Sequence, residues 1–174
     1  NHSWDGEKMG NVNYRIDDRL IHGQVITAWT RYYKLEKIII VDDQVAVDPI
    51  QRQIIKAVAP PNIVVDVLSV KDGYEAIVNA SEAQTSTLVL VKGPKALLSL
   101  LEMGIDIKEV IIGGMQFISG RKQITRTVSV TPEEAEEFWK LHEKGVELAI
   151  QLVPTERRSQ LVTMLSKIFP RGGQ

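Results

Sequence analysis

Hydrophobic positions along the chain alternate between short continuous runs and longer segments with helical spacing. The short runs are rich in Ile and Val and are bounded by polar residues or glycine, which is typical of strands buried on both faces of a sheet. We predict strands within residues 11–16, 37–43, 62–69, 86–92, 109–114, 124–130 and 146–153. Apolar residues at helical spacing predict helices over residues 23–34, 49–58, 93–104, 131–145 and 155–168.

Two of these helices carry clear start signals. Asp48 is a candidate N-cap followed by Pro49, and Thr131 is followed by Pro132 and a run of glutamates. An N-cap side chain accepts from a free N–H group of the first helical turn, and proline has no N–H group to satisfy. Acidic side chains in that turn interact favourably with the positive end of the helix dipole.

Strands that alternate with helices predict an α/β fold. We expect an open, mostly parallel twisted sheet of about six or seven strands with helices on both faces. Residues 115–130 interrupt the alternation, because a turn at Ser119-Gly120 leads to the next apolar run without a helix. This segment predicts a hairpin or an antiparallel edge strand.

Length, charge and composition indicate the number of domains, the kind of partner and the location of the protein. The 174 residues suit one domain, which we place at residues 9–174, with Met9 as the natural start and residues 1–8 as an expression remnant. The net charge of −1 argues against nucleic acid as a partner. The chain has no cysteine, and no apolar run approaches the ~20 residues that span a bilayer, so we expect a cytoplasmic protein.

In parallel sheets of this kind, ligands bind outside the carboxyl ends of the strands. The segments expected at that edge are residues 17–22, 42–48, 92–95 and 113–116. They would bring together one histidine, arginines, acids and the pair Gly113-Gly114. The two glycines suit either a turn or a close approach of the backbone to a ligand.

Several common site motifs are missing. The chain has neither the nucleotide P-loop nor the dinucleotide-binding glycine pattern nor the serine-hydrolase elbow. His22 and His142 lie far apart and belong to no pair with metal-ligand spacing. We therefore expect neither a cofactor nor a metal.

His22 is the strongest candidate for chemistry. It lies where the first strand gives way to a helix, next to free backbone N–H groups and the positive end of the helix dipole. That setting favours a phosphoryl group and the neutral, nucleophilic imidazole. Arg19 can donate to phosphoryl oxygens, and Arg15 can add charge or hold a carboxylate. Either Asp17 or Asp18 can accept from one ring nitrogen of His22 and leave the other free to attack.

Structural explanations compete with these functional ones. The charged residues beside His22 are also consistent with a solvated turn. His142 is explained as a helix-end residue, and Asp42-Asp43 as a turn pair. Trp29, Tyr32 and Tyr33 are more simply explained by packing than by a sugar-stacking platform.

The stretch RIDDRLIHGQV at residues 15–25 resembles the signature of a known family. The family is the B component (IIB) of enzyme II in the bacterial phosphoenolpyruvate-dependent sugar phosphotransferase system, mannose/fructose/sorbose class. VAPP at residues 58–61, IIGGM at 111–115 and residues 127–148 resemble the family at matching places. The likeness runs from about residue 11 to residue 168.

The resemblance implies a function and a set of site residues. His22 would be phosphorylated on Nδ1 by the IIA component and would pass the phosphoryl group to a hexose entering through the membrane components IIC and IID. It implies a cytoplasmic protein associated with the inner face of the membrane. Arg19 would stabilise the phosphoryl group, and Asp17 and Arg15 would support the site. The residues expected at the phosphate loop or its rim are Gly23, Gln24, Gly113 and Gly114.

Two other functions remain as alternatives. A histidine phosphatase or mutase also places a His-Gly pair after its first strand, but it needs an arginine where this chain has Ile21, and a second histidine. A noncatalytic phosphosugar-binding module would use His22 only as a hydrogen-bond donor.

Overall fold

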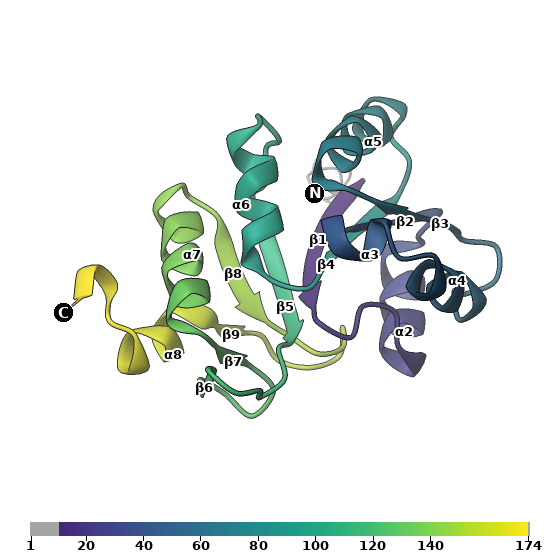
Figure 1. Cartoon of the computed structure of the whole chain (residues 1–174). Coiled ribbons are helices and arrows are strands. Elements are labelled where there is room, and N and C mark those ends of the chain that lie inside the picture. The colour runs from purple at the N-terminus through teal and green to yellow at the C-terminus, as the bar shows by residue number, and fades with distance from the viewer. Residues whose placement is uncertain (1–10, 174) are drawn as a thin grey trace, which may run out of the picture.

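The computed structural model describes residues 11–173, which form an α/β fold around one seven-stranded sheet (Figure 1). The strand order is β3-β2-β4-β1-β5-β8-β9, and all neighbours are parallel except β9, which is antiparallel to β8 at the edge. The predicted fold class is confirmed. The suggested expression remnant at residues 1–8 lies outside the described residues. The strands of this sheet are β1 (Val12–Asp17), β2 (Lys37–Val41), β3 (Val64–Leu68), β4 (Thr87–Val91), β5 (Glu109–Gly114), β8 (Glu147–Ile150) and β9 (Ser159–Gln160).

Helices cover both faces of the sheet. The helices are α2 (Gly23–Tyr33), α3 (Asp43–Ala46), α4 (Pro49–Ala57), α5 (Val70–Ala83), α6 (Pro94–Glu102), α7 (Pro132–Glu143), α8 (Leu161–Ile168) and the 3₁₀ turn η1 (Arg171–Gly173). Strand β2 shows which helices cover which face, because its side chains alternate between the two faces of the sheet. Ile38 and Ile40 pack in the cluster that includes α2 and α4, whereas Ile39 packs in the cluster that includes α5, α6, α7 and α8.

The predicted helix starts are confirmed. Asp48 accepts hydrogen bonds from the backbone N–H groups of Ile50 and Gln51. Thr131 and Glu134 form a reciprocal capping box at the start of α7.

Our predictions include no helix over residues 70–83, where the structure has α5. This helix contains Gly73, and a Cβ there would lie 2.8 Å from Val41 on β2. The glycine permits close packing of helix on sheet, and it also weakens the helical pattern in the sequence.

Two predicted boundaries were wrong. The last helix starts at Leu161 rather than at residue 155, because the preceding residues form a loop and β9. The predicted strand over residues 124–130 contains only β7 (Ser129–Val130), because Ile124 and Thr125 both donate to the carbonyl of Val128 in a tight turn. Strand β7 pairs with β6 (Lys122–Gln123) in a separate antiparallel sheet, so the predicted hairpin is present but lies outside the main sheet.

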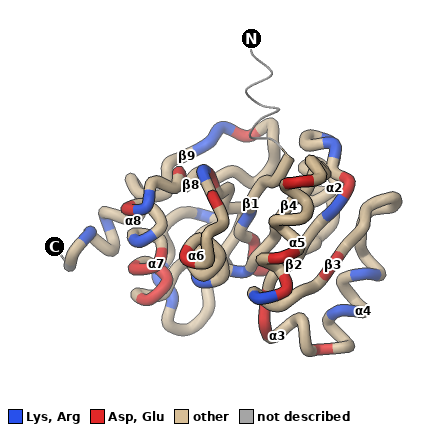
Figure 2. Tube along the Cα trace, turned by 90° about the horizontal axis from the view of Figure 1, so that it is seen from above, with Lys and Arg blue, Asp and Glu red and all other residues tan. Residues whose placement is uncertain are grey.

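The topology places β1 between β4 and β5 near the middle of the sheet. The loops after β1 and β5 therefore leave the same edge side by side, and the loop after β2 leaves it two strands away. Acidic residues gather on α7, whereas Lys and Arg mark α4, so neither sign of charge covers the whole surface (Figure 2). Within the described residues no helix is long and apolar enough to cross a membrane.

Candidate functional site

The site begins with the alternation of side chains along β1. Tyr14 and Ile16 enter the apolar cluster beneath α5 and α6. Arg15 and Asp17 consequently point to the opposite face, where α2 begins, and both are buried. Two charged residues two positions apart on a central strand therefore share one side of the sheet.

Arg15 is held on every side by polar or aromatic groups. Its Nη1 and Nη2 donate to the carbonyl oxygens of Gln151 and Leu152, each at 2.9 Å. Its guanidinium carbon lies 5.0 Å from the centre of the Trp29 ring, and its Nη2 lies 3.8 Å from a carboxylate oxygen of Asp17. Burial lowers the pKa of Arg15 to about 10, and the Asp17 charge opposes that shift. The predicted support of a carboxylate by Arg15 thus involves Asp17.

Asp17 is the centre of the site. Its Oδ1 accepts from the backbone N–H and the Nε of Arg19, at 3.1 and 3.2 Å. Its Oδ2 lies 2.8 Å from Nε2 of His22. A carboxylate only accepts hydrogen bonds, so beside ionised Asp17 the neutral His22 ring carries its proton on Nε2. Nδ1 then has a free lone pair, and no residue between 11 and 173 hydrogen-bonds to it.

His22 is the N-cap residue of α2, and its side chain is 23% exposed. It makes no capping hydrogen bond, and the first turn of α2 contains no acidic residue. Left-handed conformations flank this position, at Leu20 (φ 59°) before His22 and at Gly23 (φ 48°) directly after it. The free N–H groups and the positive end of α2 therefore lie next to the ring, as suits an anion.

Gly113 and Gly114 leave room for the side chains of Arg15 and Arg19. A Cβ at Gly113 would lie 2.0 Å from Nη2 of Arg15, and one at Gly114 would lie 3.0 Å from Nη2 of Arg19. Both glycines are buried at the end of β5. From the sequence we expected these two glycines to form a turn or to let a ligand approach the backbone. The structure shows instead that arginine side chains pack against them.

Comparison with known proteins identifies the kind of site. Residues 12–169 match the family described as "PTS system sorbose subfamily IIB component". The chain belongs to this family. Its fold is also that of solved members, including the IIBSor domain of the sorbose permease from Klebsiella pneumoniae, with a TM-score of 0.86 and 31% identity over 91% of this chain and 98% of that one.

Sequence relatives support the same family assignment. The chain is 36% identical over 160 residues to the fructose-specific EIIB component of Bacillus subtilis (strain 168), covering 92% of this chain and 98% of that protein. It is 37% identical over 154 residues to the mannose-specific EIIAB component of Escherichia coli (strain K12), covering 88% of this chain. It spans only 48% of that longer protein. The resemblance noted from the sequence is confirmed.

This IIB component is a phosphoryl-transfer component of sugar uptake, and IIB components work with IIA and with membrane IIC and IID components. The phosphatase or mutase alternative is not favoured, and neither is the phosphosugar-binding module. His142, the second histidine considered, lies in the last turn of α7 against Trp139. Since His22 lies at the carboxyl edge and α7 begins there, the two rings lie at opposite ends of the molecule.

Sequence reasoning missed a network beside the site. Asp18 accepts from Nη1 of Arg121 at 3.0 Å and from the backbone N–H of Gln116 at 2.8 Å. Arg121 also donates two hydrogen bonds to Glu134 at the start of α7. Burial lowers the pKa of Arg121, but these hydrogen bonds outweigh it, so its pKa lies above the ordinary value. Arg121 is 103 residues from Asp18, and nothing local in the sequence indicates the contact.

The remaining residues considered from the sequence lie outside the hydrogen-bond network of His22. Asp42 caps α3, and Asp43 accepts from the backbone N–H of Val70. Trp29 is buried and donates to the carbonyl of Leu152, which confirms packing for this residue, whereas Tyr32 is 61% exposed. Gln24 is exposed next to Gly23. No group of three or more His, Cys, Asp or Glu suited to a metal ion occurs within residues 11–173.

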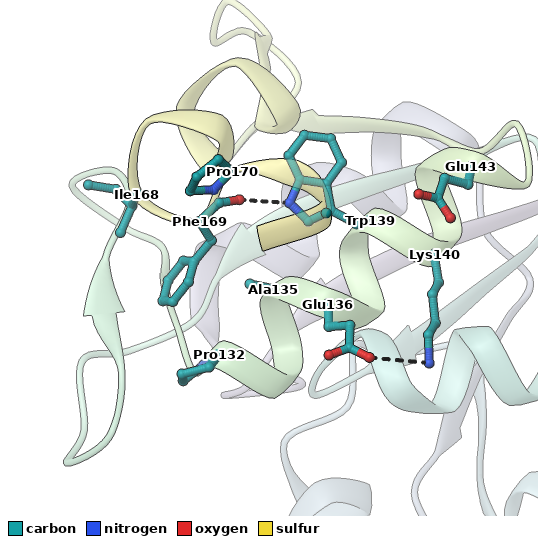
Figure 3. A pocket seen from close by; sticks show the side chains of 10 residues that line it. Pro132, Ala135, Glu136, Trp139, Lys140, Glu143, Ile168, Phe169 and Pro170 are labelled. Carbon is teal, nitrogen blue, oxygen red and sulfur yellow. Dashed lines mark hydrogen bonds and ion pairs between the residues drawn. The ribbon is translucent and has the colours of Figure 1, made fainter. Parts of the chain in front are cut away.

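A cavity of about 490 Å³ lies elsewhere, between α7 and the C-terminal segment (Figure 3). Trp139 closes part of it and donates a hydrogen bond of 2.8 Å to the carbonyl of Phe169. Its lining includes no residue of the loop between β1 and α2, so it is separate from the site of His22.

Proposed function

We propose that this IIB component carries a phosphoryl group on Nδ1 of His22. The IIA component supplies the group from a phosphohistidine, and a hexose presented by the membrane components IIC and IID receives it. The protein acts in the cytoplasm, at the inner face of the membrane, where those partners meet.

One observation carries the proposal: Nε2 of His22 lies 2.8 Å from Asp17, while Nδ1 is unengaged within the described residues. The contact favours one neutral tautomer and fixes the plane of the ring, because Asp17 is itself held by Arg19 and Arg15. The nucleophilic nitrogen is thereby chosen before the donor arrives. Preorganisation of this kind favours transfer, because phosphoryl transfer depends mainly on positioning and charge stabilisation.

Arg19 and the start of α2 provide the charge. Arg19 uses Nε and Nη2 on Asp17, and its side chain is partly exposed at the mouth of the site. Its guanidinium and the free N–H groups of α2 can share the negative charge of the oxygens on phosphorus. Gly23 and Gln24, at the first positions of α2, form the rim of this anion site.

The two transfers balance without a cofactor. In the first, Nδ1 of His22 attacks phosphorus, a P–N bond to His22 forms, and the P–N bond to the donor histidine breaks. In the second, a hydroxyl oxygen of the hexose attacks phosphorus and the P–Nδ1 bond breaks. The released imidazole takes up the hydroxyl proton. Asp17 stabilises the ring whenever it carries positive charge.

The test uses radiolabelled phospho-IIA and the purified chain. We expect acid-labile, base-stable label on the wild type, none on His22→Ala, and transfer to sugar when membranes with IIC and IID are added. His22→Ala should remain folded, because the residue is partly exposed at a helix start. Persistent labelling of His22→Ala would overturn the proposal, as would release of phosphate from simple phosphoesters by the chain alone.

A further inference from the structure

Four of the ten exposed large hydrophobic side chains among the described residues lie at the edge of the sheet that carries His22. Among the described residues, the three most exposed large hydrophobic side chains are Val47 at 80%, Ile50 at 69% and Phe117 at 69%. Ile118, next to Phe117, is also exposed. An exposed apolar cluster beside polar residues typically marks an interaction site.

The topology places these four residues on both sides of His22. Val47 and Ile50 follow the carboxyl end of β2, at the end of α3 and the start of α4. Phe117 and Ile118 follow the carboxyl end of β5. Strand β1, which leads to His22, lies between β2 and β5 in the sheet. We call these four side chains the apolar rim.

Both halves of the apolar rim are firmly held. Arg121 donates through its backbone N–H to the carbonyl of Ile118 at 3.0 Å and through Nη1 to the carbonyl of Gln116 at 2.7 Å. Its bonds to Asp18 and Glu134 fix this loop to the His22 loop and to α7. On the other side, Val45 of α3 belongs to the same buried cluster as Leu20 and Ile21. Rigid presentation lowers the entropy lost when a partner binds.

We propose that the apolar rim is the docking surface for the phosphorylated IIA component, an inference that rests on the proposed function. The donor imidazole must approach Nδ1 of His22 in line, so the donor covers the surface on both sides of the ring. Apolar contacts then surround Arg19, whose positive charge matches the phosphoryl group on the donor. Only two pairs of side chains make the rim, which fits a small interface that forms and separates quickly during a relay.

The same fold contains matched controls. Val58 and Val64 are 55% and 58% exposed but lie at the end of α4 and the start of β3, which is the opposite edge of the sheet. Val58 follows the same helix that begins near Ile50. The double change Val58→Ser/Val64→Ser removes two apolar side chains, as each double change in the rim does, but at the edge of the sheet opposite His22.

The test measures the initial rate of phosphorylation of the full chain against the concentration of phospho-IIA. We expect Val47→Ser/Ile50→Ser and Phe117→Ser/Ile118→Ser each to raise the KM for phospho-IIA about tenfold with kcat nearly unchanged. Val58→Ser/Val64→Ser should change the KM less than twofold. Urea unfolding of all three double variants confirms that each is folded at the assay temperature.

The outcomes separate this inference from the proposed function. If wild type gains no label on His22, the proposed function fails whatever the rim does. If wild type is labelled and the rim variants keep the wild-type KM, the docking surface is refuted. A loss confined to sugar phosphorylation by membranes containing IIC and IID also refutes it, and assigns the rim to the membrane partner.

Discussion

The change Gly113→Ala tests most sharply how the buried charges are packed. A Cβ at this position would lie 2.0 Å from Nη2 and 2.6 Å from the guanidinium carbon of Arg15, and 3.0 Å from Oδ2 of Asp17. The backbone of Gly113 is outside the left-handed region, so alanine has no conformational penalty there. The whole effect comes from the clash.

Arg15 has no room to yield. It is 2% exposed and is held by the carbonyls of Gln151 and Leu152, by the Trp29 ring and by Asp17. Moving the guanidinium aside breaks both hydrogen bonds to the carbonyls, and each bond to a charged group contributes roughly 1.5–3 kcal/mol. We therefore expect Gly113→Ala to lower the free energy of unfolding by about 3–6 kcal/mol, out of a total of about 5–15 kcal/mol for a typical domain.

Gly114→Ala is the matched control. Its Cβ would lie 3.0 Å from Nη2 of Arg19, the end of a flexible side chain that is partly in solvent. Arg19 can shift, so we expect less than about 1 kcal/mol, within the range of ordinary surface changes. Urea unfolding followed by circular dichroism measures both free energies.

A double substitution isolates the mechanism. With Arg15→Met in place, the guanidinium is gone and Gly113→Ala should cost less than about 1 kcal/mol further, a strong departure from additivity. Equal losses for the two glycine variants in the native background would show that the clash with Arg15 is not the cause. The same conclusion would follow if Gly113→Ala lowered the free energy of unfolding as much in the Arg15→Met background as in the native one.

Three further outcomes follow from the structure. Asp17→Asn should slow phosphorylation of His22 by about 10²-fold, because the acceptor that orients the ring loses its charge; a rate within threefold of wild type contradicts this. Thr131→Ala should lower the free energy of unfolding by about 1 kcal/mol through the lost capping box and leave labelling intact, which unfolding and labelling assays check. Burial raises the pKa of Tyr33 to about 12, so the folded state keeps a proton that the unfolded chain loses near its ordinary value of 10.0. Stability present below pH 10 should decline by about 2 kcal/mol as the pH rises to 12, and Tyr33→Phe should remove that part of the decline in alkaline unfolding curves.

Local patterns were sufficient to predict most of the fold. The Ile and Val runs of β2, β4 and β5 are buried on both sides, and a strand of this kind has a distinctive continuous pattern. Asp48 and Thr131 were predicted as helix caps because capping is a local interaction. The boundaries that failed, at residues 124–130 and 155–168, lie where short strands and turns are fixed by tertiary hydrogen bonds.

The site was predictable only in part for the same reason. The position of His22 before α2 follows from the strand-to-helix change, and the shared face of Arg15 and Asp17 follows from alternation along β1. The sequence left open whether Asp17 or Asp18 contacts His22. The left-handed turn at Leu20, which brings His22 back to Asp17, has no glycine to mark it. The carbonyls that hold Arg15 are 136 and 137 residues away.

In the proposed mechanism, the contact of Nε2 with Asp17 reserves Nδ1 of His22 for the phosphoryl group. Nitrogen-15 and phosphorus-31 NMR of the chain, labelled in its histidines and phosphorylated by phospho-IIA, reads the site of attachment directly. We expect phosphorus coupled to Nδ1 of His22, with Nε2 still protonated and hydrogen-bonded. Phosphorus on Nε2, or on any other residue, would contradict it.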